Sequence, residues 1–334
     1  MSLSTSTIIT MSSHHWLLAW MGLELNTLSI LPMIIKSHHP RAAEAATKYF
    51  LVQAMAAALI LFAGIMNAWQ MGHWSITNTS APTTNVLITL AVALKLGMAP
   101  MHMWYPEVMQ GVNMNTALIL STWQKIAPLT LLYLMNHLPT NILVAVGLAS
   151  ALFGGWLGLN QTQTRKIMAL SSIAHMGWLI IALNFNPNIT TLTLLTYIAM
   201  TTTMFLLLNM TTTKTLSDLA ATWSYAPMLT VMTMVVLMSL GGLPPLTGFA
   251  PKWLILGQLA NMKLLTIGAA MAAASLPSLF FYIRMTYITT LLAPPNTTNT
   301  QHNWRFKLHT TQAPPITAAA ATLLLPLTPL MLIF

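Results

Sequence analysis

The length of its apolar runs limits what this chain can fold into more than any other feature. Residues 190–210 and 313–333 are almost free of charge over about 20 residues, the length of helix that spans a bilayer. Charged residues make up only 5% of the chain and hydrophobic residues 56%, whereas about a quarter of the residues of soluble domains are charged. Such a chain cannot cover a water-facing surface, so we infer that lipid surrounds it.

Within lipid, every backbone polar group needs an internal partner, which leaves only helices or a closed barrel. Barrel strands alternate apolar and polar residues, whereas the runs here are continuously apolar. We therefore predict an all-α polytopic membrane protein with about 10–11 transmembrane helices, after a first dozen residues that are helical at most and too short to cross. The predicted spans are 14–35, 47–68, 84–108, 114–136, 140–160, 165–185, 190–210, 227–261, 264–288 and 313–333.

Several classes of function are excluded by what the sequence lacks. Without cysteine, the chain cannot form disulfides or ligate iron–sulfur clusters. It has no glycine-rich dinucleotide or phosphate motif, and residues 1–13 do not form a signal peptide. The pairs His14-His15 and His38-His39 point apart on a helix and do not predict a metal site. We expect no cofactor or metal to be bound by this chain.

The net charge of +9 does not indicate nucleic-acid binding, because the basic residues are scattered through loops without interleaved aromatic residues. If the spans alternate in direction, nearly all these residues lie on one side, and Lys263 alone lies on the other. Cytoplasmic or matrix loops carry such an excess. The residues predicted on that side are Lys36, Arg41, Lys48, Arg165, Lys166, Lys214, Arg284, Arg305 and Lys307.

Two spans contain a similar interruption. Leu96-Gly97-Met98-Ala99-Pro100 and Leu240-Gly241-Gly242-Leu243-Pro244-Pro245 both have the pattern Leu-Gly-x-x-Pro with a lysine nearby. Proline removes a backbone donor and clashes with the preceding turn, so we predict helix breaks at Gly97, Pro100, Gly241, Pro244 and Pro245. Paired broken helices of opposite direction indicate an inverted repeat with an ion site at the break.

We accordingly interpret residues 1–334 as a single membrane domain. Its first repeat would occupy residues 1–136 and its second, inverted repeat residues 140–288. Residues 313–333 would form a C-terminal helix outside both repeats. No linker is long enough to separate soluble domains.

Four charged residues lie far from any predicted span end: Glu24, Lys95, Lys125 and Lys252. Each costs roughly 2.5–3.5 kcal/mol at the centre of a membrane even on a lenient scale, and such residues usually face the interior and mark ion paths. Burial disfavours the charged forms of both residue types, which suits them to exchanging protons near neutral pH. A static ion pair between Glu24 and one lysine is the alternative, although one glutamate cannot neutralise three lysines.

The remaining titratable residues are weaker candidates. His175 lies in the middle of a span and is equally compatible with a proton relay and with a hydrogen-bonded core histidine. His102, close to Pro100, is a less favoured relay. Glu107 is expected to cap or to pair with a loop, and Glu44 and Asp218 to form solvated pairs with nearby lysines.

Several segments together resemble one family, NADH dehydrogenase subunit 2, the mitochondrially encoded antiporter-like subunit of respiratory complex I. The resemblance covers essentially the whole chain and is closest to the vertebrate form. The segments that carry it are Trp20-Met21-Gly22-Leu23-Glu24-Leu25-Asn26, His39-Pro40-Arg41, Glu44-Ala45-Ala46-Thr47-Lys48-Tyr49-Phe50, Thr122-Trp123-Gln124-Lys125-Ile126-Ala127-Pro128, residues 158–168 and residues 241–253.

The resemblance implies a fold of two inverted five-helix repeats, each with a discontinuous helix, that forms one proton-translocating module of the membrane arm. By motif, Glu24 is similar to the family's glutamate and Lys48 to the lysine that pairs with it. Lys95 and Lys252 are similar to the lysines of the two broken helices, and Lys125 to the connecting lysine. Members usually keep a full span before the glutamate helix, and residues 1–13 are shorter than that span.

The resemblance also implies the setting of the chain. NADH, FMN, iron–sulfur clusters and ubiquinone are implied in other subunits, so we expect no redox catalysis in this chain. The implied partners are other membrane-arm subunits, including neighbouring antiporter-like subunits, and lipids such as cardiolipin, rather than a second copy of the chain or nucleic acid. The implied location is the mitochondrial inner membrane, with the basic loops toward the matrix.

Two alternative functions remain open on the sequence. One is a stand-alone cation/proton antiporter that shares the repeat. The other is a structural helix bundle that joins neighbouring subunits. A quinone site is a weaker interpretation, since no polar cluster resembles a headgroup site.

Overall fold

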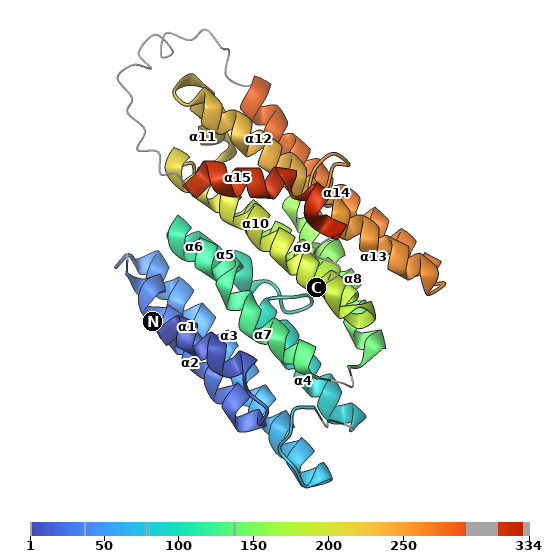
Figure 1. Ribbon diagram of the computed structural model, residues 1–334. Helices are drawn as coiled ribbons and strands as arrows, with labels where there is room; N and C mark the ends of the chain where they lie inside the picture. The colour runs from blue at the N-terminus through green and yellow to red at the C-terminus, as the bar shows by residue number, and fades with distance from the viewer. Residues whose placement is uncertain are drawn as a thin grey trace. The chain divides into compact units, whose positions relative to one another are not determined.

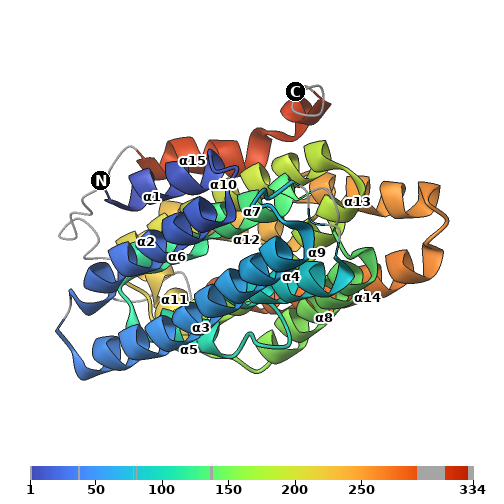
Figure 2. The same ribbon diagram turned by 90° about the horizontal axis from the view of Figure 1, so that it is seen from below.

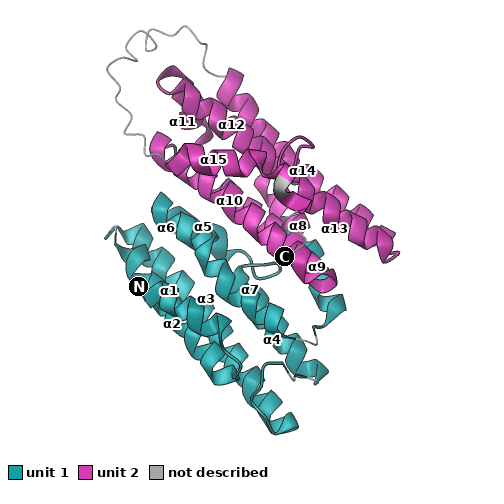
Figure 3. Ribbon diagram, viewed as in Figure 1, with its two compact units in different colours: residues 1–150 teal, residues 151–334 magenta. Residues whose placement is uncertain are grey.

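The computed structural model describes residues 2–36, 38–77, 79, 81–135, 138–291 and 313–329. These residues form α-helices, short 3-10 helices and two isolated β-bridges (Figure 1), which confirms the all-α prediction. The chain divides into two compact units, Met1–Ser150 and Ala151–Phe334 (Figure 3). The division lies inside α8 (Thr140–Gly158), so each unit is described by itself.

In the first unit, helix α3 packs against α2, α4 and α5, and α1 packs on α2 and α7. The ten residues of α1 extend only about 15 Å, too short to cross a bilayer, as predicted. The helices are α1 (Ser2–Met11), α2 (Trp16–Ile35), α3 (Pro40–Met71), α4 (Pro82–Leu96), α5 (Trp104–Gly111), α6 (Met114–Ser121) and α7 (Trp123–Leu134).

In the second unit, α9 is the central helix, because 83% of its most apolar stretch is buried. Helix α15 lies along α10 (Figure 2). The helices are α9 (Thr164–Phe185), α10 (Pro187–Thr211), α11 (Leu216–Ala221), α12 (Pro227–Gly241), α13 (Phe249–Asn261), α14 (Leu265–Leu291) and α15 (Ala313–Leu323), with 3-10 helices η1 (Thr222–Ser224) and η3 (Leu325–Leu327).

The loops before α9 and before α11 are joined at one end of the second unit by an isolated bridge between Gln163 and Thr215. Asp218 and Thr215 form a capping box at the start of α11, in which each side chain accepts a backbone N–H of the other residue. The backbone N–H of Thr215 lowers the pKa of Asp218. Asp218 is therefore a helix cap rather than simply a solvated partner of lysine.

Seven described segments are long and apolar enough to cross a membrane: the helices α2, α3, α8, α9, α10 and α14, and α6 taken together with α7. The predicted spans 84–108 and 227–261 are each divided into two shorter helices. Within the predicted span 313–333, α15 ends at Leu323 and η3 follows, so the described part of this span is not one continuous helix. Pro326 explains the ending, since proline clashes with the residue four positions earlier. Residues 330–333 lie outside the described residues.

Both interruptions are made by glycine in the left-handed conformation. Helix α4 ends at Leu96 and is followed by Gly97 with φ 72°, and α12 ends at Gly241 and is followed by Gly242 with φ 82°. In each case the next N–H, of Met98 or Leu243, donates back to a carbonyl of the last helical turn.

This ending is the common glycine-capped helix terminus. The prolines lie in the link that follows. Glycine therefore ends each helix, Gly242 takes the position expected for Gly241, and the prolines prevent the helix from resuming at once.

One further interruption is absent from the sequence prediction. The expected span 114–136 is divided into α6 and α7 at Thr122, whose backbone has φ −111° and ψ −69°. The Thr122 hydroxyl donates to the Leu118 carbonyl at 2.7 Å. Threonine is common in uninterrupted membrane helices as well, so nothing in the local sequence distinguishes this one.

The close crossing of α8 and α9 depends on Gly154. A Cβ at this residue would lie 2.7 Å from the Ala174 nitrogen and 2.8 Å from the Leu170 carbonyl oxygen. We expect Gly154→Ala to cost about 1–3 kcal/mol by overpacking, measured as a lower thermal denaturation temperature of the assembled protein. Gly257→Ala is the control: it meets nothing within 4 Å and should stabilise α13 by up to about 1 kcal/mol. Equal effects of both variants would contradict the prediction.

Candidate functional site: two lysine cavities

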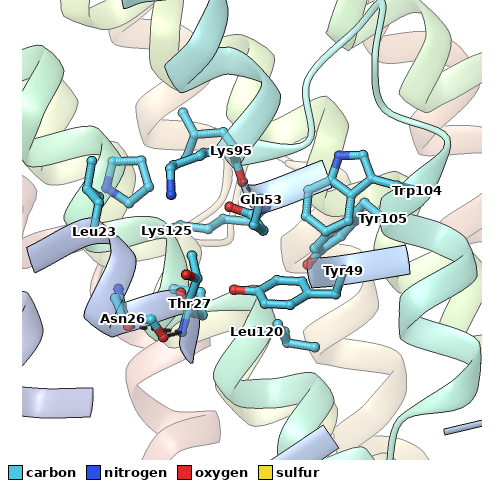
Figure 4. Close-up of a pocket in the computed structure, with 13 residues that line it drawn as sticks. Leu23, Asn26, Thr27, Tyr49, Gln53, Lys95, Trp104, Tyr105, Leu120 and Lys125 are labelled. Carbon is cyan, nitrogen blue, oxygen red and sulfur yellow. Dashed lines mark hydrogen bonds between the residues drawn. The ribbon is translucent and has the colours of Figure 1, made fainter. Parts of the chain in front are cut away.

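Lys95 and Lys125 line one cavity in the first unit (Figure 4). Lys95 lies in the last turn of α4, and Lys125 in the first turn of α7. Both are buried, with exposed fractions of 6% and 2%. The cavity has a volume of about 20 Å³, which is room for a water molecule. The other lining residues are Leu23, Asn26, Thr27, Tyr49, Gln53, Leu96, Trp104, Tyr105, Leu120, Gln124 and Pro128.

Uncharged polar side chains fix the helix ends around this cavity. The Gln53 amide of α3 donates to the Lys95 carbonyl at 3.2 Å, which caps the end of α4. The Gln124 amide donates to the Asn26 side-chain oxygen at 3.0 Å and so ties α7 to α2. The Lys125 ammonium lies 4.9 Å from the centroid of the Tyr105 ring. Contacts from neighbouring helices therefore hold the backbone of Lys95 and the ammonium of Lys125.

Glu24 lies beside this cavity on α2 without lining it. Its Oε2 atom is buried without a hydrogen-bond partner, on the helix that contributes Leu23, Asn26 and Thr27 to the cavity lining. The two ion pairs found among the described residues both involve Lys48. The alternative of a static Glu24–lysine pair is therefore not the arrangement in the described part of the chain.

Lys48 lies apart from Glu24. Its ammonium contacts the Glu44 carboxylate at 2.5 Å and the Glu107 carboxylate at 2.7 Å. The side chain of Lys48 is 41% exposed. The pairing with Glu24 that the family resemblance implied is not formed among the described residues, and the proton-transfer role of Lys48 stays a prediction. The reason is geometric, since Glu44 lies one turn earlier on α3 and Glu107 lies on α5, which packs against α3.

His175 and Lys252 line a second cavity, also of about 20 Å³, in the second unit. The Lys252 ammonium donates to the Gly241 carbonyl at 2.8 Å. A cation there caps the last turn of α12 and faces the negative end of its dipole. Lys252 of α13 therefore caps the carboxyl end of α12, the helix that precedes the break.

His175 is surrounded by aromatic residues. Its Nε2 lies 3.4 Å from the Tyr282 hydroxyl, and its ring centroid lies 5.7 Å from that of Tyr197. This arrangement satisfies a core histidine and also places an exchangeable nitrogen in the cavity wall shared with Lys252. The geometry is compatible with both interpretations of His175.

Sequence reasoning found the lysines and missed the groups that hold them. Gln53, Asn26 and Gln124 are uncharged polar residues inside apolar spans, and that signal could have identified them. Tyr105 and Tyr282 carry no such signal, because buried tyrosine is ordinary packing in most helices. Among the described residues, no three histidine or carboxylate side chains gather as a metal site.

The broken helices and buried lysines are features of a membrane ion-transport module, and comparison with known proteins agrees. Residues 13–277 match the family model of NADH:quinone oxidoreductase/Mrp antiporter membrane proteins. Residues 279–332 match the model of the NADH dehydrogenase subunit 2 C-terminus. The class defined by fold and site is therefore the antiporter-like membrane subunit.

Curated relatives narrow the class. NADH-ubiquinone oxidoreductase chain 2 of Carassius auratus is 54% identical over 99% of this chain and 96% of the relative. That of Struthio camelus is 50% identical over the same shares of the two chains. The chain belongs to the NADH-ubiquinone oxidoreductase chain 2 family.

Solved structures share the fold. A chain of respiratory complex I from Thermus thermophilus has a TM-score of 0.85 and 26% identity, over 99% of this chain and 76% of that one. A chain of the Mrp complex from Dietzia sp. has a TM-score of 0.79 and 15% identity, over 99% and 73%. The second likeness is one of fold alone.

The Gln53 cap can be tested by substitution. We expect Gln53→Leu to leave the Lys95 carbonyl uncapped in a buried place, at a cost of about 1–3 kcal/mol, seen as a lower denaturation temperature of the assembled protein. Gln161→Leu is the control, because the Gln161 amide also donates to a helix-end carbonyl, that of Leu157, at 3.2 Å but is only half-buried. Similar losses in the two variants would show that burial of the cap is unimportant.

Proposed function

We propose that this chain translocates protons as a module of the membrane arm of an NADH:ubiquinone oxidoreductase. The observation that carries the proposal is that Lys95 and Lys125 line one water-sized cavity, next to which α2 carries Glu24 with a buried carboxylate oxygen. Buried ionisable residues of this kind are expensive and usually mark ion paths. Membership in the NADH-ubiquinone oxidoreductase chain 2 family supplies the setting.

In the first cavity, repulsion between two ammonium groups in a poorly hydrated space favours a state with a single positive charge. A carboxylate beside Lys95 stabilises the positive charge on that lysine. Loss of this stabilisation favours transfer of the proton from Lys95 to Lys125 through a cavity water. Glu24 would therefore control where the proton resides. Lys48 would contribute through its carboxylate partners, whose charge it balances at the edge of the unit.

In the second cavity, Lys252 and His175 are the proton-carrying groups. Protonated Lys252 is stabilised by the Gly241 carbonyl, so loss of its proton weakens the cap of α12. His175 can accept a proton at one ring nitrogen while releasing one from the other. Helix endings at Gly97 and Gly242 place both lysine sites at interruptions of the backbone.

Electron transfer belongs to other subunits of the oxidoreductase, which carry NADH, FMN, iron–sulfur clusters and quinone. This chain is a multi-pass protein of the inner membrane. Its apolar outer face would contact lipid, including cardiolipin, and neighbouring membrane-arm subunits. The two inverted repeats remain our interpretation of the paired breaks.

A purely structural bundle is the main competing function. It predicts that neutralising a buried lysine matters only through assembly. We expect Lys95→Met to assemble yet to lower the number of protons translocated per electron by this module's contribution, because the cavity loses one of its two carriers. NADH oxidation with a soluble acceptor should be unchanged.

The matched control is Lys214→Met, since Lys214 is exposed between α10 and α11. Proton stoichiometry, measured in reconstituted vesicles, should be normal for Lys214→Met and reduced for Lys95→Met. Normal stoichiometry in an assembled Lys95→Met enzyme would refute the proposal. Isolation of the chain without any flavin-containing assembly would instead favour a stand-alone antiporter.

We further propose that the basic loops face the matrix. Lys36, Arg41 and Lys214 lie at helix ends on the side that we predict to face the matrix. Lys263, which follows α13, lies at the predicted opposite side. Arg305 and Lys307 lie outside the described residues. The excess of basic residues in short loops sets this orientation.

Because the chain contains no cysteine, single cysteines report orientation directly. We expect Lys214→Cys to react with an impermeant maleimide only in inverted membranes, and Lys263→Cys only in right-side-out membranes. Both lysines are exposed, which makes them a matched pair. Labelling of both from one side would contradict the alternating topology.

A further inference from the structure

Tyr105 presents its ring face to Lys125. The ammonium nitrogen lies 4.9 Å from the ring centroid, and both residues are only 2% exposed and line the same cavity (Figure 4). A cation within about 6 Å of an aromatic face is attracted by the ring quadrupole, most strongly where both are desolvated. Because both residues are buried, the ring stabilises the ammonium charge of Lys125 more strongly than it would at an exposed site.

The position of Tyr105 is fixed by an aromatic cluster. Trp104 meets Tyr105 edge-on, with ring centroids 5.5 Å apart and planes at 88°. Tyr49 of α3 packs on Trp104 with centroids 6.0 Å apart. The Tyr105 N–H donates to the His102 carbonyl at 3.1 Å. The ring is thus anchored to the start of α5 and to α3.

The same cluster packs directly on the first helix break. A Cβ at Gly97 would lie 3.2 Å from both Trp104 and Tyr105 side-chain atoms. Gly97 takes φ 72°, the conformation that ends α4 one residue after Leu96. The absence of a side chain therefore lets the break approach the aromatic pair. Lys95 precedes this break by two residues.

We propose that Tyr105 is a positioning residue for Lys125: its ring, held against the Gly97 break, keeps the Lys125 ammonium in the cavity that faces Lys95. The break at Gly97 and Lys125 are then linked through the ring of Tyr105. A rearrangement at Gly97 moves the ring and changes what the ammonium faces. The consequence for pumping rests on the proposed function above, whereas the contact itself does not.

Other charged and titratable groups face the same space. Lys95 and Tyr49 line the same cavity, and Glu24 lies on α2, which contributes further lining residues. The test must therefore isolate the Tyr105–Lys125 pair. A double-mutant cycle does so, because it removes the effects that each substitution has by itself.

We expect Tyr105→Leu to destabilise the assembled protein in the presence of Lys125 and much less in a Lys125→Met background. The coupling should correspond to about a tenfold change in the unfolding equilibrium, measured from the denaturation of the assembled protein. Tyr105→Phe keeps the ring face and should behave like the unaltered chain. Tyr133→Leu, on α7 with a tyrosine that is 48% exposed, is the control without coupling.

Equal losses from Tyr105→Leu in both backgrounds would overturn the proposal, because the ring would then be a packing element only. So would a Tyr105→Phe variant as impaired as Tyr105→Leu, since the hydroxyl would be the important group. If Tyr105→Leu does not assemble, Tyr105→Met fills the space without a ring. If adding Lys125→Met restores assembly of the Tyr105→Leu or the Tyr105→Met variant, the proposal is supported. If it restores assembly of neither variant, the proposal is refuted.

Proton stoichiometry separates this inference from the proposed function. Tyr105→Leu should lower protons translocated per electron, and Tyr105→Phe should not. Energetic coupling between Tyr105 and Lys125 with normal stoichiometry in Lys125→Met would support the positioning contact and remove the pumping role of Lys125.

Discussion

The rest of the structure depends on how the broken helices end inside the membrane. A helix leaves its last carbonyls without intrahelical donors, and in lipid no bulk water can replace them. Here the N–H groups of Gly97 and Gly242, together with that of the residue after each glycine, satisfy two carbonyls at each break. A side chain from another helix satisfies one more. At both breaks, a buried polar side chain therefore supplies a hydrogen bond that the interrupted helix lacks.

The same requirement explains why two of the candidate lysines are found at the breaks. The carbonyl end of a helix carries partial negative charge, which favours a nearby cation. Lys95 occupies the last turn of α4, and Lys252 reaches the last turn of α12 from the following helix. A lysine elsewhere in these spans would have no such compensation. The two helix ends therefore provide favourable places for an ammonium without a carboxylate in contact, whereas the ammonium of Lys125, in the first turn of α7, instead faces the ring of Tyr105.

The extent of sequence prediction follows from these physical causes. Continuous apolar runs and isolated charges act over a whole span, so the helices and the lysines Lys95, Lys125 and Lys252 could be predicted. The end of α15 at Leu323 and the interruption at Thr122 depend on single residues that long membrane helices often tolerate. The partners of Lys48 and the ring facing Lys125 depend on which helices pack together. No local pattern encodes that packing.

The two breaks are closed by chemically different groups, and this difference separates the roles of their lysines. In the first unit a neutral amide, Gln53, caps α4, so Lys95 can lose its proton without opening the helix end. In the second unit Lys252 is itself the cap of α12. Deprotonation of Lys252 weakens a charge-assisted hydrogen bond and therefore loosens the break. Proton release would change only the charge in the first cavity. In the second cavity it would change the charge and also weaken the hydrogen bond that caps the backbone of α12.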